Sequence, residues 1–312
     1  MTQYIPLHWH STFSFLEAIW TVKKIAEKAK KMELPAIAIT DYNGMYGAVQ
    51  FYNLAKDLGF KPIVWVELWF VLDADSDYSI QSIGTICLLA RDLTGYHNLM
   101  KLVSFANTKG MTTKPKIDIL ELQKHWDGLI AFMGGEFSRI GKMITAGESE
   151  SKITEIIWQI QQAVGAENVY LEVTAQEHKA YQALEKINPT IVALAGSLEI
   201  KCIVNNNYFH VLKKDRKARE AALAIKDNMK LYDPTRRKPA GKHHIMTADE
   251  IMTICKANGY TEEQITHRLE NNLAIADSIQ TEIVLGKTYF PNYDPPEETV
   301  QMYEKYKDIL VE

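Results

Sequence analysis

Short apolar runs alternate with stretches of helical periodicity along most of the chain. The runs expected to form strands cover residues 4–10, 35–40, 61–68, 84–90, 128–133, 169–173 and 201–204. Apolar residues recur at helical spacing at about 20–31, 48–58 and 96–107, and an amphipathic helix candidate follows each later strand. This order predicts a mainly parallel sheet with helical crossovers.

The number of these units indicates the architecture. About seven strand-and-helix units suit a closed α/β barrel better than an open sheet. A doubly wound open sheet is the alternative. The rhythm stops after about Asp277, where prolines precede a final helical stretch. We therefore expect a barrel domain over residues 1–276 and, over 277–312, a linker with a helix that leads towards a further domain absent from this chain.

Composition narrows the class of protein. The chain has 312 residues, of which 46% are hydrophobic and 24% charged, as in soluble globular proteins. A formal charge of −4 gives no global attraction to nucleic acid, so any DNA contact should be local. Three scattered cysteines without a CxxC pair favour a cytoplasmic location over a secreted disulfide framework. No apolar stretch approaches a membrane span, so we expect no membrane partner.

Imidazole and carboxylate groups gather at the predicted strand ends. His8 and His10 stand two apart at the end of the first strand and should face the same side. Asp41 follows residues 35–40, Glu67 closes the next strand, and Glu17 lies in the first loop. In a parallel barrel such ends meet at one mouth. Together these groups predict a site for Zn²⁺ or Mn²⁺.

Each member of this set also has an ordinary structural explanation. A lone HxH pair in a strand is more often structural than metal-binding. Asp41 after a strand is also the usual position of a helix cap, and Glu67 between tryptophans could be an exposed carboxylate. The joint placement of all these groups at strand ends favours the metal site over the separate explanations.

Six sequence blocks resemble the PHP domain of bacterial DNA polymerase III alpha subunits, over about residues 4 to 300. They are LHWHSTFSFLEA, AIAITDYNGMYGAVQFYNLAKDLGFKPIVWVEL, GYHNLMKLVS, KPKID, GLIAFMGGEFSRIGK and FHVLKKDRKAREAALAIK. The blocks around GAVQFY and GYHNLMKLVS are particular to the polymerase branch. The resemblance implies a distorted (β/α)₇ barrel of PHP type. Where its ligands are intact, this family holds a trinuclear metal cluster and hydrolyses phosphoesters.

The resemblance also implies which ligand positions are kept. His8, His10 and Glu67 match ligands of the family, and Asp41 matches the first residue of its Asp-His pair. Glu17 stands where the family usually has Asp. These five residues are the expected residual metal site, holding at most one Zn²⁺ or Mn²⁺ ion.

Other ligand positions have changed. Tyr42 replaces the His of the Asp-His pair, and a neutral phenol is a poor zinc ligand. Gly135 falls where the family supplies Cys, while Asn207 and Phe209 fall where it has Asp and His. His210 is one residue further on, where strand alternation would aim it to the other face. Asn207 and His210 remain weaker ligand candidates, and so, for the unplaced histidine, do His97 and His125.

Basic residues form two groups near the C-terminal third of the barrel. The loop DPTRRKPAGKHH carries Arg236, Arg237, Lys238 and Lys242 and is the candidate for DNA or partner contact. A second run on a predicted helix is more typical of a solvated face and comprises Lys213, Lys214, Arg216, Lys217 and Arg219. His243 and His244 have no carboxylate or cysteine at ligand spacing, which argues against a metal there.

The resemblance and the changed ligands together predict a mainly structural domain of a replicative polymerase. It would support the Mg²⁺-dependent polymerase core, meet DNA through the full-length enzyme, and dock replisome proteins such as a proofreading exonuclease subunit or a sliding clamp. The polymerase palm would lie beyond Glu312, so this chain should not extend DNA. One alternative is a metal-dependent phosphoesterase or 3′→5′ exonuclease. Another is a free-standing PHP phosphatase.

Overall fold

The computed structural model describes residues 3–73, 83–288, 290 and 293–307. The chain divides into two compact units, Met1–Glu282 and Ile283–Glu312. The first contains the sheet and the helices that pack on it. The described part of the second contains helix α11, Glu297–Tyr306, which has no buried residue. None of the helices in the described ranges is long and apolar enough to cross a membrane.

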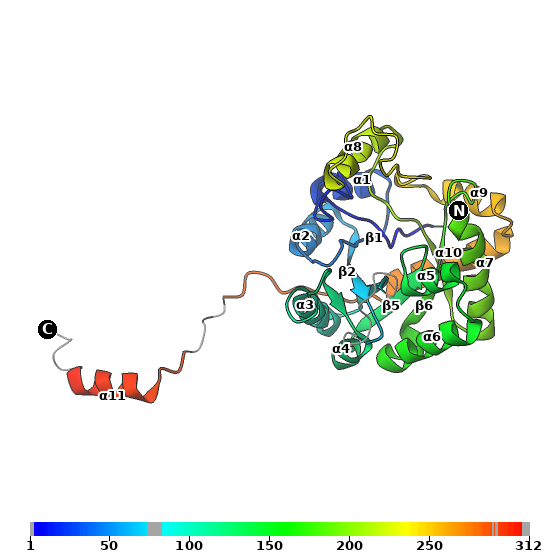
Figure 1. The fold of residues 1–312 in the computed structure, drawn as a ribbon. Coiled ribbons are helices and arrows are strands. Elements are labelled where there is room, and N and C mark those ends of the chain that lie inside the picture. The colour runs from blue at the N-terminus through cyan, green and yellow to red at the C-terminus, as the bar shows by residue number, and fades with distance from the viewer. Residues whose placement is uncertain (1–2, 74–82, 289, 291–292, 308–312) are drawn as a thin grey trace. The chain divides into compact units, whose positions relative to one another are not determined.

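The first unit is a mixed α/β fold around one curled sheet, with helices on its outside (Figure 1). Within the described residues the strand order is β1 (Ala36–Ile39), β2 (Lys61–Phe70), β3 (Gly84–Ala90), β5 (Leu129–Gly134), β6 (Val169–Thr174) and β7 (Cys202–Asn205), and β4 (Lys116–Ile117) pairs with β2. The sequence therefore predicted the fold class and six of these strands. It missed β4, which is two residues long.

Strand direction departs from the expected pattern at one position. The pairs β1–β2, β5–β6 and β6–β7 are parallel, but β3 is antiparallel to both β2 and β5. Because β2 and β3 are consecutive in the chain, an antiparallel pairing needs only a return loop, whereas a parallel one needs a crossover, usually a helix. The sheet is thus mainly parallel, with one reversed strand.

The N-terminal segment runs between the two outer strands of the sheet. We expected a strand over Tyr4–His10, but the segment is extended chain with a single bridge, Trp9 to Tyr208. The carbonyl of Trp9 accepts from the amide of Thr40, which follows β1, at 2.8 Å. On the other side the amide of His10 donates to the carbonyl of Tyr208, which follows β7, at 2.9 Å. The segment thereby links both edges of the sheet.

Two local features explain why this segment forms no regular strand. Pro6 has no backbone N–H to donate. The amide of Leu7 donates to the side-chain oxygen of Asn205 instead of to a neighbouring carbonyl. Side chains of the segment consequently do not alternate strictly between two faces. Leu7 packs in the apolar cluster inside the sheet, and the adjacent His8 lines the cavity described below.

Helices of the first unit surround the sheet (Figure 1). They are α1 (Val22–Lys31), α2 (Ala48–Leu58), α3 (Leu93–Asn107), α4 (Ile119–Lys124), α5 (Arg139–Ala146), α6 (Glu150–Val164), α7 (Gln182–Ser197), α8 (Arg216–Lys226), α9 (Ala248–Ala257) and α10 (Glu262–Ser278). We expected α1 from Trp20. It begins two residues later because the Thr21 side chain accepts from the third helical amide and caps the helix.

The inside of the sheet is apolar at one end and polar at the other. Along β2, Ile63 and Trp65 point into a buried cluster, and two residues further on the same face carries Glu67. β6 repeats this pattern with Tyr170 followed by Glu172. The apolar side chains thus fill one end of the space inside the sheet, and the polar side chains lie directly beyond them at the other end.

Candidate metal site

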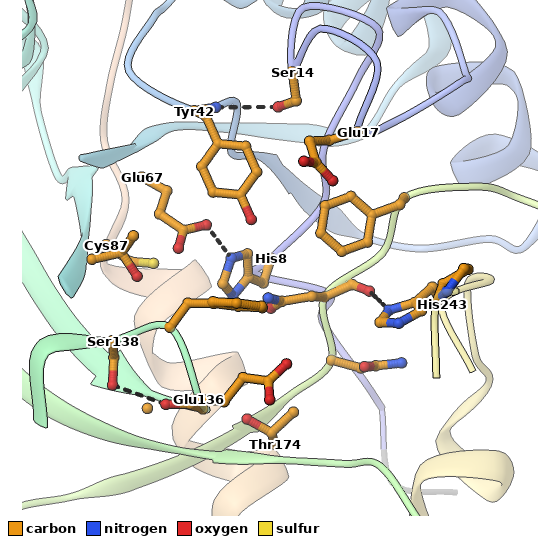
Figure 2. A pocket seen from close by; sticks show the side chains of 18 of the residues that line it. His8, Ser14, Glu17, Tyr42, Glu67, Cys87, Glu136, Ser138, Thr174 and His243 are labelled. Carbon is orange, nitrogen blue, oxygen red and sulfur yellow. Dashed lines mark hydrogen bonds and ion pairs between the residues drawn. The ribbon is translucent and has the colours of Figure 1, made fainter. Parts of the chain in front are cut away.

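A cavity of about 750 Å³ opens at the polar end of the sheet. Its walls come from the loop after the N-terminal segment, from strand residues, from helix α8, and from residues 237–240 and His243. Figure 2 shows the side chains of several elements converging on this space, among them His8, Glu67 and Cys87.

Three ligand-type side chains meet at the base of the cavity. His8, Glu67 and Cys87 are buried, and one potential ligand atom of each lies within 4.8 Å of the others. The Nε2 atom of His8 is 2.9 Å from Oε2 of Glu67. The strand register pairs Glu67 directly with Cys87 across β2 and β3, which puts their side chains on one face. An imidazole, a carboxylate and a thiol form a donor set that suits zinc.

Two more ionisable groups adjoin this triad. Nδ1 of His8 is 3.4 Å from Oε2 of Glu172, an ion-pair distance without hydrogen-bond geometry. Nε2 of His10 is 3.5 Å from Oε2 of Glu67. The expectation that His8 and His10 face the same side is met, since their rings lie 5.2 Å apart. His8 therefore lies between two buried carboxylates.

Burial and the two neighbouring carboxylates set the pKa values of His8 and Cys87. Burial by itself lowers the pKa of His8, but the carboxylates of Glu67 and Glu172 outweigh it and raise that pKa to about 9. Burial, with the same carboxylates, raises the pKa of the Cys87 thiol well above its usual range. At neutral pH His8 is an imidazolium and Cys87 a thiol, so a metal ion would have to displace both protons.

The second histidine lies inside a stack of rings. His10 is sandwiched between Tyr42, with centroids 4.4 Å apart, and Phe209, 4.5 Å away and nearly parallel. Burial lowers the pKa of His10 well below its usual range, and the nearby charges of His8 and Arg219 act in the same direction. Burial also keeps Tyr42 neutral by raising its pKa. The stack is uncharged and closely packed.

The Asp41 carboxylate is occupied by hydrogen bonds. Ser11 donates to it through its amide at 2.7 Å and its hydroxyl at 2.6 Å. Ser14 donates through its amide at 3.1 Å and its hydroxyl at 2.7 Å. Burial raises the pKa of Asp41, while these donors act against that rise. Four donors use most of the acceptor capacity that a metal ion would need.

Glu17 lines the same cavity but pairs with cations. Its carboxylate is 2.7 Å from Nζ of Lys226 and 3.1 Å from Nη1 of Arg237. The structure thus brings His8, His10 and Glu67 together and gives Asp41 and Glu17 other partners.

The weaker ligand candidates are scattered. Asn207 lines the cavity, and its buried Oδ1 has no hydrogen-bond partner among the described residues. Nδ1 of His210 is 2.9 Å from the carbonyl of Leu212, and burial lowers the His210 pKa to about 4. His97 is exposed on α3, and His125 pairs with Glu121 at 3.3 Å. Asn207 therefore lines the cavity, whereas His97, His125 and His210 do not.

Gly135 cannot easily regain a ligand side chain. Its backbone is left-handed, with φ of 72°, and an added Cβ would lie 2.9 Å from the hydroxyl of Thr174. A cysteine at this position would be strained.

Most of the basic loop is already paired with acids. Arg236 binds Glu220 at 2.8 Å, and Lys242 binds Glu177. Besides Glu17, Arg237 binds the carboxylate of Asp227 at 3.0 Å. Lys238 lines the cavity.

Sequence reasoning missed Cys87 and Glu172. Glu172 carries a signal in the sequence, because it is an acid inside the apolar run VYLEV. Cys87 lies within an unbroken apolar run and has no such signal. It reaches the site because β3 runs antiparallel beside β2, a direction that hydrophobic periodicity does not encode.

Curated relatives of this sequence are DNA polymerase III alpha subunits. That of Deinococcus radiodurans is 31% identical and covers 91% of this chain, which spans 22% of it. The alpha subunit of Borreliella burgdorferi is 28% identical, and the match covers 100% of this chain and 27% of the relative. The alpha subunit of Thermus aquaticus is also 28% identical, and the match covers 91% of this chain and 23% of the relative. The chain therefore spans about a quarter of the length of these relatives.

Among solved structures, an amidohydrolase from Chromobacterium violaceum aligns with 66% of this chain and 87% of its own at 12% identity. Its TM-score of 0.43 is too low to bear on fold or function. The family model of the PHP domain matches residues 6–176, more than half of the sequence. As the resemblance of its sequence blocks implied, this chain belongs to the PHP domain family.

Proposed function

We propose that this chain is a scaffold domain of a replicative DNA polymerase III alpha subunit and not a hydrolase. The observation that carries the proposal is the ring stack of Tyr42, His10 and Phe209. In the resemblance described above, Tyr42 and Phe209 occupy positions where catalytic members of the family have metal-binding histidines. The stack fills with packed aromatic surface the space in which a multi-metal cluster would need ligands.

The charge pattern around the stack supports the same conclusion. A trinuclear centre needs several carboxylates whose oxygens are free to bind cations. The carboxylate of Asp41 receives four hydrogen bonds from Ser11 and Ser14, and that of Glu17 is neutralised by Lys226 and Arg237. Both carboxylates already have the partners that a metal would have to replace.

One ion is the most that the remaining donors favour. His8, Glu67 and Cys87 would hold it, with Glu172 beside them. A thiol and an imidazole favour Zn²⁺ over Mn²⁺, which prefers oxygen ligands. When bound, such an ion would lower the pKa of a coordinated water. Loss of the His8 proton and the Cys87 proton would accompany its binding.

Metal-dependent phosphoester hydrolysis, including 3′→5′ exonuclease activity, is the second candidate. The observation in its favour is the cavity of about 750 Å³, which His8, Glu67 and Cys87 all line. Such a space is of the size that small-molecule ligands occupy. Two observations argue against hydrolysis: Tyr42 and Phe209 stand at positions where the family has histidine ligands, and Asp41 and Glu17 have other partners.

Partners follow from the polymerase relatives. We propose that DNA is reached through the full-length polymerase, whose Mg²⁺ ions belong to a domain outside this chain, and that residues 277–312 connect the two. An exonuclease subunit or a sliding clamp would dock on the domain. The residue of the basic loop best suited to contact DNA is Lys238, because the other three are ion-paired. The gene sequence beyond codon 312 separates this proposal from a free-standing phosphatase.

Hydrolysis of a labelled single-stranded oligonucleotide in Mn²⁺ tests the proposal. The purified chain should release no more product than the His8→Ala, His10→Ala double variant, because no multi-metal centre forms. It should also add no nucleotide to a primed template. Mn²⁺-dependent release of mononucleotides that the double variant lacks would overturn the scaffold proposal in favour of the exonuclease.

A further inference from the structure

Residues 234–241 form part of the cavity wall without regular secondary structure, and we call this segment the strap. Residues 237–240 of the strap line the cavity. Pro234 and Pro239 have no amide hydrogen to donate. Among the described residues, no backbone-to-backbone hydrogen bond joins the strap to the sheet or to a helix. Side chains therefore hold most of the strap in place.

Neutral groups anchor the chain directly after the strap. The carbonyl of Lys242 accepts from Nε2 of Gln176 at 2.5 Å and from Nδ2 of Asn206 at 2.7 Å. The amide of Lys242 donates to the side-chain oxygen of Gln176 at 2.8 Å. Gln176 and Asn206 are buried, so dissolved salt has little effect on these bonds. This end should stay in place when the ionic strength changes.

Gly241 separates the anchor from the rest of the strap. Its backbone is left-handed, with φ of 66°, and an added Cβ would lie 2.3 Å from the side-chain oxygen of Gln176. Glycine adopts this conformation without strain and also reaches others at little cost. The chain can therefore turn at Gly241 while the anchor holds.

Two carboxylates hold Arg237 in the middle of the strap. Its guanidinium lies 3.1 Å from Oε1 of Glu17, and it binds Asp227 through two nitrogens at 3.0 and 3.1 Å. Glu17 belongs to the loop after the N-terminal segment, and Asp227 directly follows α8. We call these three residues the latch. The Arg237 side chain is 45% exposed, so salt should weaken the latch.

Two further arginines add charged contacts to the strap. Arg216, from the basic run of α8 that was predicted to be a solvated face, donates to the carbonyls of Pro239 at 2.6 Å and Gly241 at 3.3 Å. Arg236 pairs with Glu220 at 2.8 Å. The strap is thus held by charged side chains along its length and by neutral groups only at its end.

We propose that the strap is a salt-sensitive cover on one side of the cavity. It opens at Gly241 when Arg237 leaves Glu17 and Asp227, and the opening widens the approach to the base of the cavity. Exposed ion pairs are individually weak and are screened by salt, so a small change in charge releases the strap. This cover goes beyond the scaffold proposal, because it controls access to the cavity whether or not the cavity hydrolyses an ester.

Limited trypsin digestion tests the opening of the strap. Trypsin cuts after Arg236 and Arg237 once these side chains have left their acids, and mass spectrometry locates the cuts. When opening is fast relative to cleavage, the rate follows the population of the open form. Raising NaCl from about 0.05 M to about 0.5 M should speed cleavage in the strap severalfold. A free peptide of residues 231–243 corrects for the effect of salt on trypsin itself.

Substitution of the two latch acids should open the strap at low salt. The double variant Glu17→Gln, Asp227→Asn should be cut about 4- to 25-fold faster than the wild type, which is about two- to fivefold for each exposed ion pair. The matched control is Glu177→Gln, which removes the acid paired with Lys242 on the anchored side of Gly241. Because neutral groups hold that side, the control should stay within about twofold of the wild type.

The thiol of Cys87 reports on access to the base of the cavity. Cys87 lines the cavity and is 5% exposed. In a Cys202→Ser, Cys255→Ala background it is the one thiol left in the chain, and its reaction with an aromatic disulfide reagent is followed by absorbance. The double variant in this background should react faster, by a factor close to that for trypsin, and Glu177→Gln should not.

Each of the other outcomes would overturn part or all of the proposal. Equal cleavage of the wild type and the double variant, or equal acceleration by Glu177→Gln, would overturn the latch. Faster cleavage without faster reaction of Cys87 would overturn the control of access. Cuts spread over the whole first unit of the double variant would show that the two acids stabilise the entire fold and not the strap. The scaffold proposal is tested separately by oligonucleotide hydrolysis, so it stands or falls independently of these results.

Discussion

The imidazole of His8 lies between two buried carboxylates, 2.9 Å from Glu67 and 3.4 Å from Glu172. A metal ion would balance those charges in a catalytic member of the family. Here the proton on His8 offsets one of the two negative charges, because the two acids raise the pKa of His8 to about 9 against the effect of burial. A single residue thus supplies the cation between the two acids.

Replacing His8 by Gln should destabilise the fold. The substitution keeps a polar side chain of similar reach but leaves Glu67 and Glu172 without the cation that lies between them. Removing one partner of a buried ion pair costs about 3–5 kcal/mol. Urea unfolding in the presence of a chelator measures the loss, and His97→Gln on an exposed helix face serves as the control. A His8→Gln variant as stable as the control would show that the charge of His8 does not stabilise the fold.

The stability of the chain should be greatest near pH 6.5. Because the folded pKa of His8 is raised to about 9, its contribution is complete below about 6.5 and is lost as pH rises through 9. His10, His210 and His243 have lowered pKa values in the fold, so their contribution is lost as pH falls below about 6.5. The urea concentration at the unfolding midpoint, measured from pH 4 to 10, tests both the loss of stability above pH 6.5 and the loss below it. In His8→Gln the loss between pH 6.5 and 9 should be smaller, and parallel curves for the two proteins would contradict the assignment.

At the scale of elements, the stack on His10 joins three parts of the chain. His10 belongs to the N-terminal segment, Tyr42 follows β1, and Phe209 follows β7. The N-terminal segment is also linked to the segment after β7 by the bridge between Trp9 and Tyr208, and to the end of β1 by the hydrogen bond from Thr40 to Trp9. Aromatic contacts and backbone pairing therefore hold together the place where the sheet edges meet.

Restoring imidazoles on both sides of His10 should restore metal binding. The double variant Tyr42→His, Phe209→His replaces the two neutral rings on either side of His10 by two metal-binding rings. We expect more Zn²⁺ per chain than in the wild type, at some loss of stability, because the ring contacts on His10 become weaker. Elemental analysis after dialysis measures the gain, with Tyr42→Phe as the control. An unchanged metal content would mean that the backbone, and not the two side chains, excludes the second ion.

Sequence patterns predicted some elements well and others poorly for identifiable reasons. Helix α2 occupies the residues that periodicity indicated, Ala48–Leu58, because its apolar positions recur cleanly on one face. The direction of β3 was not predictable, because a fully buried strand is an unbroken apolar run whether it pairs in a parallel or an antiparallel direction. Cys87 was missed with it. Spacing indicated the proximity of His8, His10 and Glu67, but it could not indicate the serine donors around Asp41 or the cations around Glu17.

At the scale of the whole chain, stability should reside in the first unit. No described residue of Ile283–Glu312 is buried, whereas apolar side chains in the described part of Met1–Glu282 form large buried clusters. Ending the chain after Glu282 should change the free energy of unfolding by less than about 0.5 kcal/mol, as for changes at exposed positions. Guanidinium unfolding of the short and full chains measures this. A loss of several kcal/mol would show that the second unit contributes to the folded core.

The number of metal ions per chain tests the central claim most directly. The purified chain would be equilibrated with Zn²⁺ or Mn²⁺ at pH 8, dialysed, and analysed for metal, together with Cys87→Ser and His8→Ala. Within the described residues, His8, Glu67 and Cys87 are the one group of three such residues whose ligand atoms lie within 4.8 Å of one another. We therefore predict at most one ion, preferably Zn²⁺, and less than one in either variant. Two or three ions per wild-type chain would contradict the account and make the domain a hydrolase candidate again.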